Sequence, residues 1–183
     1  MAENFISETD IPGVLIIERP TNSDDRGFFR ETFRQADLES KLDQAVNFVQ
    51  ANHSRSIKNT LRGIHVAPWA KLVTCIRGGV QQIVVDARPD SPTFGKYISV
   101  ELGEDNWRSV YIPAGCGNAF LSLSDIADYT YLTGDYWAPG KETEIHYNDP
   151  DIGIEWQTTE PLVSERDTAA KTLREIYPGK FNA

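Results

Sequence analysis

Short segments rich in β-branched and aromatic residues recur about every ten residues through the middle of the chain, and turn residues separate them. This spacing constrains the fold most, because many short strands at regular intervals are typical of β-sandwiches and β-barrels. The pair Gly78-Gly79 separates Lys71–Arg77 from Val80–Arg88, which predicts that these two segments pair as a hairpin. Further strands are predicted at Tyr97–Leu102, Arg108–Ile112, Ala119–Leu123 and Tyr129–Thr133.

The two ends of the chain add a strand pair and two helices. Val14–Glu18 and Gly27–Phe33 are predicted to form an N-terminal pair of strands, and Gln35–Leu42 a short helix. A second helix is predicted at Thr168–Ile176, with Asp167 as its N-cap and a Pro-Gly pair after its end. The predicted fold is therefore mainly β, a jelly-roll or cupin-like β-barrel with short flanking helices. A ligand site in the mouth of the barrel is expected for such a fold.

The composition indicates a globular protein with no surface for nonspecific nucleic-acid binding. The 183 residues are 40% hydrophobic and 25% charged, which suits one domain spanning residues 1–183. The net charge of -9 excludes a general DNA- or RNA-binding role, although a local arginine cluster would suffice for a phosphorylated small molecule. We expect neither a signal peptide nor a membrane span. Cys75 and Cys116 lie among apolar residues, so we expect buried free thiols and a cytoplasmic location.

The sequence lacks the patterns of a metal site or a bound cofactor. The three histidines, His53, His65 and His146, include no His-x-His pair of the kind that cupin metal sites use. Neither a nucleophile elbow nor a glycine-rich phosphate loop occurs. We therefore expect no metal and no cofactor, and a metal-dependent cupin oxygenase is an alternative that lacks its ligands.

Residues that could carry chemistry are concentrated in the segment Gln50–Lys71. It places Arg62 and His65 three residues apart, with Lys71 six residues further along. A single histidine is more often structural than catalytic, and Arg62 and Lys71 could be solvated surface charges. The residue types alone leave both interpretations open.

The order of several short motifs resembles one enzyme family. DRGFFRE at Asp25–Glu31, FVQANHSRS at Phe48–Ser56 and LRGIH at Leu61–His65 are similar to elements of the dTDP-4-dehydrorhamnose 3,5-epimerase family. Counterparts of SPTFG, YIPAG, LSLSD, HYNDPDIGIEW and LVSERD follow in the same order, so the resemblance runs from about Ile11 to Asp167. Each motif is weak alone, whereas the ordered set is specific.

The resemblance implies an epimerase that inverts carbon 3, carbon 5 or both in a nucleotide-linked 4-keto-6-deoxyhexose. The keto group acidifies the neighbouring carbons, so a base can form an enolate and an acid can return a proton to the opposite face. By resemblance, His65 is the base and Asp167 is its carboxylate partner. Tyr131 is the acid and Lys71 lies near the enolate oxygen. Tyr129 is the alternative acid, because residues two apart on a strand share a face.

The resemblance also implies contacts with the nucleotide and a homodimer. The residues expected to bind the nucleotide-linked sugar are Arg26, Phe29, Glu31, Gln50, Asn52, Arg62, Asn118, Tyr136 and Trp137. The guanidinium of Arg62 would suit the diphosphate. The N-terminal strands are expected to cross a two-fold dimer interface and to complete the partner's site.

Two departures from the family pattern leave the substrate open. Asn118 replaces a histidine found in many members, and the loop VAPWA before Lys71 is short. A mono-epimerase for carbon 3 or carbon 5 of a CDP- or GDP-linked sugar would use the same base and acid. A non-catalytic cupin that binds a sugar nucleotide is the alternative of another class, although binding alone does not need a base, an acid and a cation together.

Overall fold

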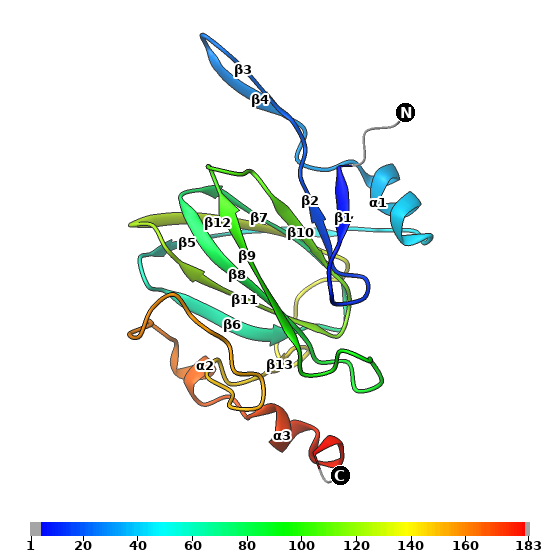
Figure 1. Cartoon of the computed structure of the whole chain (residues 1–183), viewed down its shortest axis with the longest axis vertical. Coiled ribbons are helices and arrows are strands. Elements are labelled where there is room, and N and C mark those ends of the chain that lie inside the picture. Colours follow the sequence, from blue (N-terminus) through cyan, green and yellow to red (C-terminus); the bar gives the residue numbers. More distant parts are fainter. Residues whose placement is uncertain (1–4, 182–183) are drawn as a thin grey trace.

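Two antiparallel sheets face each other in the computed structural model, which describes residues 5–181 (Figure 1). The six-stranded sheet consists, in spatial order, of β1 (Ile6–Glu8), β2 (Leu15–Ile17), β10 (Ser109–Ile112), β7 (Lys71–Arg77), β12 (Ile126–Thr133) and β5 (Gln50–Ile57). The five-stranded sheet consists of β13 (Thr143–Glu144), β6 (Leu61–Val66), β11 (Cys116–Ser122), β8 (Gly79–Asp86) and β9 (Tyr97–Gly103). The predicted mainly-β class and the predicted strands of the middle region are confirmed.

The remaining elements lie around this sandwich. The hairpin of β3 (Thr21–Asp24) and β4 (Gly27–Arg30) projects from one end of the molecule, and α2 (Glu165–Thr168) and α3 (Leu173–Ile176) lie at the other (Figure 1). The predicted helix at Gln35–Leu42 is present as α1. A short 3-10 turn, Pro178–Lys180, follows α3. No helix among residues 5–181 is long and apolar enough to cross a membrane.

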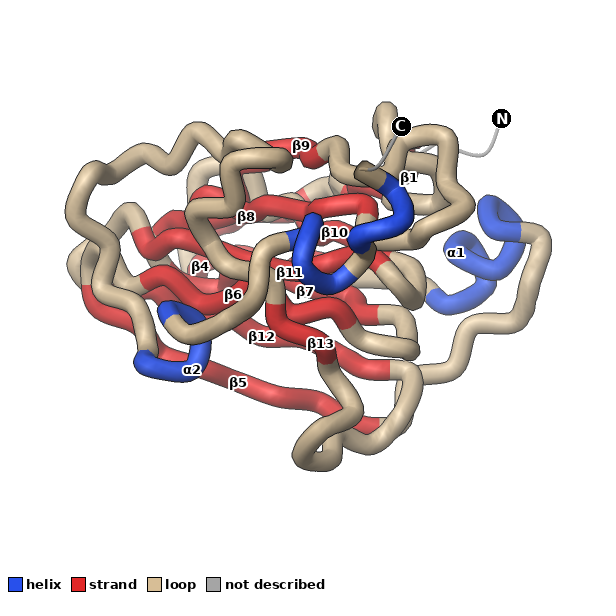
Figure 2. Tube along the Cα trace, turned by 90° about the horizontal axis from the view of Figure 1, so that it is seen from below, coloured by secondary structure: helices blue, strands red, loops and turns tan. Residues whose placement is uncertain are grey.

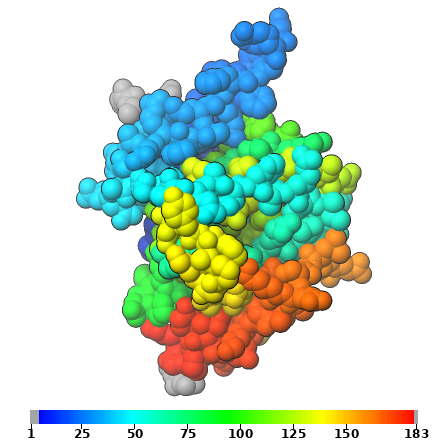
Figure 3. Space-filling view, turned by 180° about the vertical axis from the view of Figure 1, so that it is seen from behind, coloured from blue at the N-terminus to red at the C-terminus, as the bar shows by residue number. Residues whose placement is uncertain are grey.

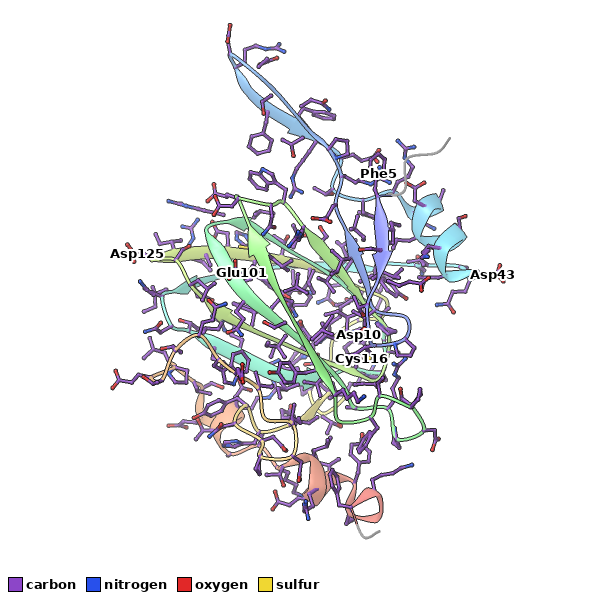
Figure 4. The ribbon with its side chains drawn as sticks, viewed as in Figure 1. Phe5, Asp10, Asp43, Glu101, Cys116 and Asp125 are labelled. Carbon is purple, nitrogen blue, oxygen red and sulfur yellow. The ribbon has the colours of Figure 1, made fainter. Side chains whose placement is uncertain are left out.

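The main core lies between the facing surfaces of the sheets, because alternate side chains of each strand point inward. Val73 and Tyr129 of the six-stranded sheet pack with Val84 and Phe120 of the other sheet, and none of the four is more than 3% exposed. The rings of Phe120 and Tyr129 stack with their centroids 4.1 Å apart. Figure 4 shows side chains filling this space, and the labelled Cys116 belongs to the same cluster.

The five-stranded sheet is buried on its outer face as well. Ile83 and Val85 of β8 pack there against Ile145 and Leu173 from the C-terminal part of the chain. Figure 2 shows that part of the chain crossing this face. Burial on both faces explains why every residue of β8 after Gly79 is buried, the polar Gln81, Gln82 and Asp86 included.

The outer face of the six-stranded sheet is covered only in part. Leu38 of α1 packs against this face together with Leu15, Leu72 and Tyr111, and all four are at most 4% exposed. Beyond α1, the same face carries Ile76, which is 42% exposed. This part of the sheet is therefore open in the single chain.

The predicted hairpin at Gly78-Gly79 is wrong. β7 pairs with β10 and β12, whereas β8 pairs with β9 and β11, so the two strands belong to different sheets. Gly78 has φ +68°, and a Cβ atom there would lie 2.3 Å from the carbonyl oxygen of Ile126. The glycines therefore form a tight corner where the chain passes from one sheet to the other.

The predicted N-terminal strand pair is also wrong, because β2 pairs with β1 and β10 while β4 pairs with β3. The predicted helix at Thr168–Ile176 is replaced by the two short helices α2 and α3. Ser164 and Thr172 cap them, so Asp167 is inside α2 and is not an N-cap. The chain leaves the helical path between them because Lys171 forms a bridge with Ile145.

Both cysteines are buried free thiols, as predicted. Burial raises the pKa of the Cys75 thiol to about 11 and that of the Cys116 thiol to about 12. Both groups therefore stay protonated at neutral pH and behave as small apolar side chains of the core.

Candidate active site

A cavity of about 310 Å³ opens between the two sheets. Strands β6 and β11 form one wall and β5, β7 and β12 form the facing wall, while the loop after β12 and helix α2 contribute to the rim. Figure 3 shows this loop, in yellow, between β5 in cyan and the C-terminal segment in orange. The cavity is lined by Gln50, Asn52, Ser54, Arg62, His65, Lys71, Asn118, Phe120, Tyr129, Tyr131, Trp137, Glu142 and Arg166.

His65 on β6 is paired with the carboxylate of Asp167, although 102 residues separate them. The two groups are 2.7 Å apart, between His65 Nε2 and Asp167 Oδ1, and the Asp167 side chain is only 5% exposed. An ionised carboxylate can only accept, so Nε2 carries the proton and donates it. The other ring nitrogen, Nδ1, has no hydrogen-bond partner among residues 5–181 and can take up a proton.

The backbone around Gly63 holds Asp167 in place. The backbone N–H of Gly63 donates to Asp167 Oδ2 over 3.3 Å. Gly63 has φ +123°, and a Cβ atom there would lie 2.5 Å from that of Ala119, so only glycine fits this position of the LRGIH motif. Burial acts to raise the pKa of Asp167, but the hydrogen bond and the charge of His65, together with the Gly63 N–H, outweigh it and leave the pKa lowered.

Tyr131 and Tyr129 both point from β12 into the space between the sheets, as their spacing predicts, but their surroundings differ. Tyr129 is 1% exposed, and its hydroxyl donates to Gln82 Oε1 over 2.6 Å. The hydroxyl of Tyr131 has no hydrogen-bond partner in the described part of the chain. Burial, followed by the charge of Glu142, raises the pKa of Tyr131, so its phenol stays protonated at neutral pH. Tyr131 is thus the tyrosine with a proton to offer to the cavity.

The two groups suited to proton transfer come from opposite walls. His65 belongs to the five-stranded sheet, and Tyr131 belongs to the six-stranded sheet, where it pairs with Asn52 and Val73. A ligand between the walls would present one face to the imidazole and the other to the phenol. This arrangement can remove a proton from one side of a carbon atom and return one from the other side.

Lys71 forms a buried ion pair with Glu142. Its Nζ atom lies 2.7 Å from Glu142 Oε1, and the two side chains are 5% and 8% exposed. The indole N–H of Trp137 donates to the other carboxylate oxygen over 3.2 Å, and Arg166 lies 3.8 Å from that oxygen. Burial acts to raise the pKa of Glu142, but the charge and hydrogen bond of Lys71 outweigh it and leave the pKa lowered.

The remaining polar side chains of the cavity are held in a network on β5 and its neighbours. Gln50 Nε2 donates to Asn52 Oδ1 over 2.8 Å, and the Trp137 backbone N–H donates to Gln50 Oε1 over 3.1 Å. The amide nitrogen of Asn52 is buried and has no partner within residues 5–181. Arg62 Nε donates to Ser56 Oγ over 3.1 Å, which leaves the rest of its guanidinium for a ligand.

Comparison with known proteins identifies the family of the chain that carries this site. A model described as dTDP-4-dehydrorhamnose 3,5-epimerase matches residues 8–175. A dTDP-4-dehydrorhamnose 3,5-epimerase from Escherichia coli (strain K12) is 44% identical, over 97% of this chain and 99% of the relative. The chain belongs to the dTDP-4-dehydrorhamnose 3,5-epimerase family.

Solved structures of similar proteins have the same fold. One is dTDP-6-deoxy-D-glucose-3,5-epimerase from Legionella pneumophila in complex with dTDP-4-keto-L-rhamnose, which is 40% identical with a TM-score of 0.90 over 96% of this chain and 95% of that chain. Another is a 3′-monoepimerase from Streptomyces bikiniensis in complex with dTDP-quinovose, which is 37% identical with a TM-score of 0.88 over 93% and 89%. The predicted cupin-type fold is confirmed by this likeness.

The structure does not bring every residue expected from the family into this cavity. Arg26 and Phe29 lie on the projecting hairpin, where Phe29 is 75% exposed. Glu31 forms ion pairs with Arg19 and Arg34 instead. Tyr136 is 65% exposed and is not part of the lining. Within a single chain, these four residues are separate from His65 and Tyr131.

Sequence reasoning missed two charged residues of the cavity. Glu142 and Arg166 lie in a loop and a four-residue helix, where single charges form no recognisable pattern. The only available signal was that LVSERD places Arg166 directly before Asp167. No group of three or more His, Cys, Asp or Glu side chains among residues 5–181 is arranged to hold a metal ion.

Proposed function

We propose that the chain is an isomerase that inverts carbon 3, carbon 5 or both in a dTDP-linked 4-keto-6-deoxyhexose, as a step in deoxysugar biosynthesis. One observation carries the proposal: His65 and Tyr131 line one cavity from opposite walls. Inversion at a carbon atom needs a base on one face and an acid on the other. The relatives that carry the names of such epimerases support the nucleotide and the sugar class.

His65 is the proposed general base. Its Nδ1 atom takes the proton from the carbon next to the keto group, and the electron pair of that C–H bond moves into the enolate. The imidazolium that forms is stabilised by the carboxylate of Asp167, which lies 2.7 Å from Nε2. Asp167 is therefore a positioning residue that also balances the charge of the protonated base.

Tyr131 is the proposed general acid. Its hydroxyl donates a proton to the enolate carbon from the other face, which completes the inversion. Its raised pKa keeps the proton in place at neutral pH until the enolate forms. Lys71 supplies a positive charge for the enolate oxygen, and Glu142 holds the ammonium group at the cavity wall. The keto group alone acidifies the reacting carbon, so this chemistry uses no metal and no redox cofactor.

The nucleotide would be bound by the polar residues at the rim. Arg62 is proposed to pair with the diphosphate, and the unpaired amide nitrogen of Asn52 is a donor available to the ligand. Gln50 and Trp137 are proposed as further contacts. Trp137 is 48% exposed and can stack on a ring of the ligand. The role of Tyr136 as a ligand contact remains a prediction.

We infer a homodimer in which the β3–β4 hairpin completes the partner's site. The hairpin projects from its own sandwich and exposes Phe28 and Phe29, at 55% and 75% (Figure 1). The open outer face of the six-stranded sheet carries a groove of about 380 Å³, whose lining includes Phe33 and Ile76. Arg26, Phe29 and Glu31 would then act on a ligand held by a second copy of the chain.

A mixing experiment tests this shared site. His65→Asn and Arg26→Ala chains should each be inactive, but a refolded mixture should regain activity, because one site of each mixed dimer is intact. A mixture that stays inactive although mixed dimers form would contradict the shared site. The active assembly is expected at twice the mass of 20.5 kDa by sedimentation.

We also propose that residues 1–183 form one cupin-like domain. Because both cysteines are free thiols, we propose that the protein works in the cytoplasm.

Incubation with a dTDP-linked 4-keto-6-deoxyhexose in deuterium oxide tests the activity itself. The proposal predicts deuterium at carbon 3, carbon 5 or both, with inverted product at each exchanged carbon. Exchange at one carbon only would identify a mono-epimerase, like the relative from Streptomyces bikiniensis. CDP- and GDP-linked sugars in parallel report the nucleotide preference. Tight binding of the dTDP-sugar without any exchange would show a non-catalytic binding protein and overturn the proposal.

A further inference from the structure

A buried cluster of uncharged polar residues lies directly beside the proposed base. Asn118 on β11 is the cross-strand partner of His65 on β6, so the two side chains are neighbours on the cavity wall. Behind Asn118 lie Gln82 and Tyr129, which are 0% and 1% exposed. The proton transfers described above do not use these three residues.

The hydrogen bonds of this cluster determine which way each amide points. Gln82 Nε2 donates to the backbone carbonyl of Ile83 over 2.8 Å, and a carbonyl can only accept. The other proton of Nε2 goes to Asn118 Oδ1 over 2.7 Å, and Gln82 Oε1 accepts from the Tyr129 hydroxyl over 2.6 Å. Turning the Gln82 amide over would bring its oxygen against two acceptors, the Ile83 carbonyl and Asn118 Oδ1, whereas turning Asn118 over would bring two NH₂ donors together. Either change would leave buried polar groups unpaired.

The Asn118 amide is therefore held in one of its two orientations. Its oxygen faces Gln82, and also lies 3.2 Å from the Tyr129 hydroxyl. Its NH₂ group then faces away from Gln82 and has no hydrogen-bond partner among residues 5–181. Because Asn118 lines the cavity, this donor is available to a ligand next to His65.

We propose that Gln82 is a positioning residue that makes Asn118 an obligatory hydrogen-bond donor to the keto oxygen of the substrate. The inference rests on the proposed function. His65 takes a proton from a carbon adjacent to the keto group, so a donor beside His65 is placed where the oxygen gains negative charge. Lys71 approaches from the opposite sheet, with its charge shared with Glu142. Asn118 adds a donor that does not titrate, and its bond strengthens as the enolate forms.

The test is a double-mutant cycle on solvent exchange. Removing one donor to a developing oxyanion typically lowers kcat by about 10²- to 10³-fold, so Asn118→Ala should lose about 10²-fold in kcat with a smaller change in KM. Gln82→Glu places an acceptor where Asn118 now finds a donor, so the Asn118 amide should turn its oxygen to the cavity and the loss should be similar. In the Asn118→Ala background, Gln82→Glu should cause almost no further loss.

The neighbouring residue Gln81 provides a matched control. It is 2% exposed on the same strand, but it binds Ser99 and Glu155 on the other face of the sheet. Gln81→Glu should leave the exchange rate within about twofold of the wild type. If Gln82→Glu does not fold, Gln82→Met removes all three hydrogen bonds of the Gln82 amide, and its smaller loss should likewise vanish in the Asn118→Ala background.

Independent losses that multiply in the double variant would overturn the inference, because Gln82 would then not act through Asn118. Full activity of Asn118→Ala would overturn it as well. Neither result would affect the proposed epimerase activity, which the wild type reports in the same assay. A wild-type chain without exchange would instead remove the proposed function, and this inference with it.

Discussion

Replacing Asp167 by asparagine tests the role of His65 as the base, because this nearly isosteric change alters which nitrogen of the His65 ring carries the proton. Asp167 Oδ2 accepts from the Gly63 N–H and Oδ1 accepts from His65 Nε2. Asparagine has only one oxygen. If that oxygen keeps the bond with Gly63, its NH₂ group faces His65 Nε2, which must then accept. The proton of the neutral ring moves to Nδ1, the nitrogen that should take up the substrate proton.

The expected magnitude follows from these contacts. A hydrogen bond to a charged group contributes about 1.5–3 kcal/mol, and the Asp167 side chain is only 5% exposed, so little solvent screens it. At about 1.4 kcal/mol per tenfold in rate, losing the charge beside the imidazolium slows proton abstraction by about 10- to 150-fold. Turning the amide over would restore the tautomer, but it would place two donors together at Gly63. We therefore expect a loss of about 10²-fold in kcat for Asp167→Asn.

The assay is the rate of deuterium incorporation into the sugar, followed by NMR or mass spectrometry at saturating substrate. Asp151→Asn is the control for the same chemical change, because Asp151 pairs with Arg174 outside the cavity, and its rate should match the wild type. A loss below about threefold for Asp167→Asn, in a folded protein, would refute the role of the carboxylate in catalysis. Its loss should also stay smaller than that of His65→Asn.

Three further predictions follow from buried polar groups. Tyr129→Phe should lower the free energy of unfolding, measured in urea, by about 1–3 kcal/mol, because Gln82 Oε1 loses its hydrogen-bond donor. The variant should still give inverted product, and a product with retained configuration would make Tyr129 the acid. Glu142→Gln should lower the free energy of unfolding by about 3–5 kcal/mol, because the buried Lys71 ammonium loses its carboxylate, and unchanged urea curves would contradict this. Hydrogen bonds from Arg88, Ser91 and Thr93 outweigh burial and lower the pKa of Asp86 to about 2. Its folded pKa lies below the unfolded value, so the ionised Asp86 adds about 2 kcal/mol to the free energy of unfolding above pH 4, and this contribution is lost as the pH falls towards 2. Asp86→Asn should lack this contribution in acid titrations.

A strand or helix could be predicted from the sequence where the residue pattern within that element alone determines its bounds. β7 has the predicted bounds, and α1 does as well. The Gly78-Gly79 hairpin failed because a glycine pair permits a sharp reversal in one sheet and also a corner between two sheets. The choice depends on distant partners of β7, namely β10 and β12, which no local pattern contains.

The candidate site shows the same division. Arg62, His65 and Lys71 are close in sequence, so a motif could identify them together. Asp167 was assigned as an N-cap from local pattern and as the partner of His65 only by resemblance, and the 2.7 Å contact exists because the fold spans 102 residues. Glu142 could not be predicted, because its importance arises from burial beside Lys71 and not from its neighbours in the chain.

The most direct test of the account compares His65→Asn and Tyr131→Phe in deuterium oxide on one dTDP-linked 4-keto-6-deoxyhexose. With the base removed from one wall, His65→Asn should show no exchange above background, a loss of at least about 10²- to 10⁴-fold. With the acid removed from the other wall, Tyr131→Phe should retain some exchange but give little inverted product, because the base can still form the enolate and return a proton to the original face. Wild-type exchange by His65→Asn, or normal inversion by Tyr131→Phe, would contradict a mechanism with its base and acid on opposite walls of this cavity.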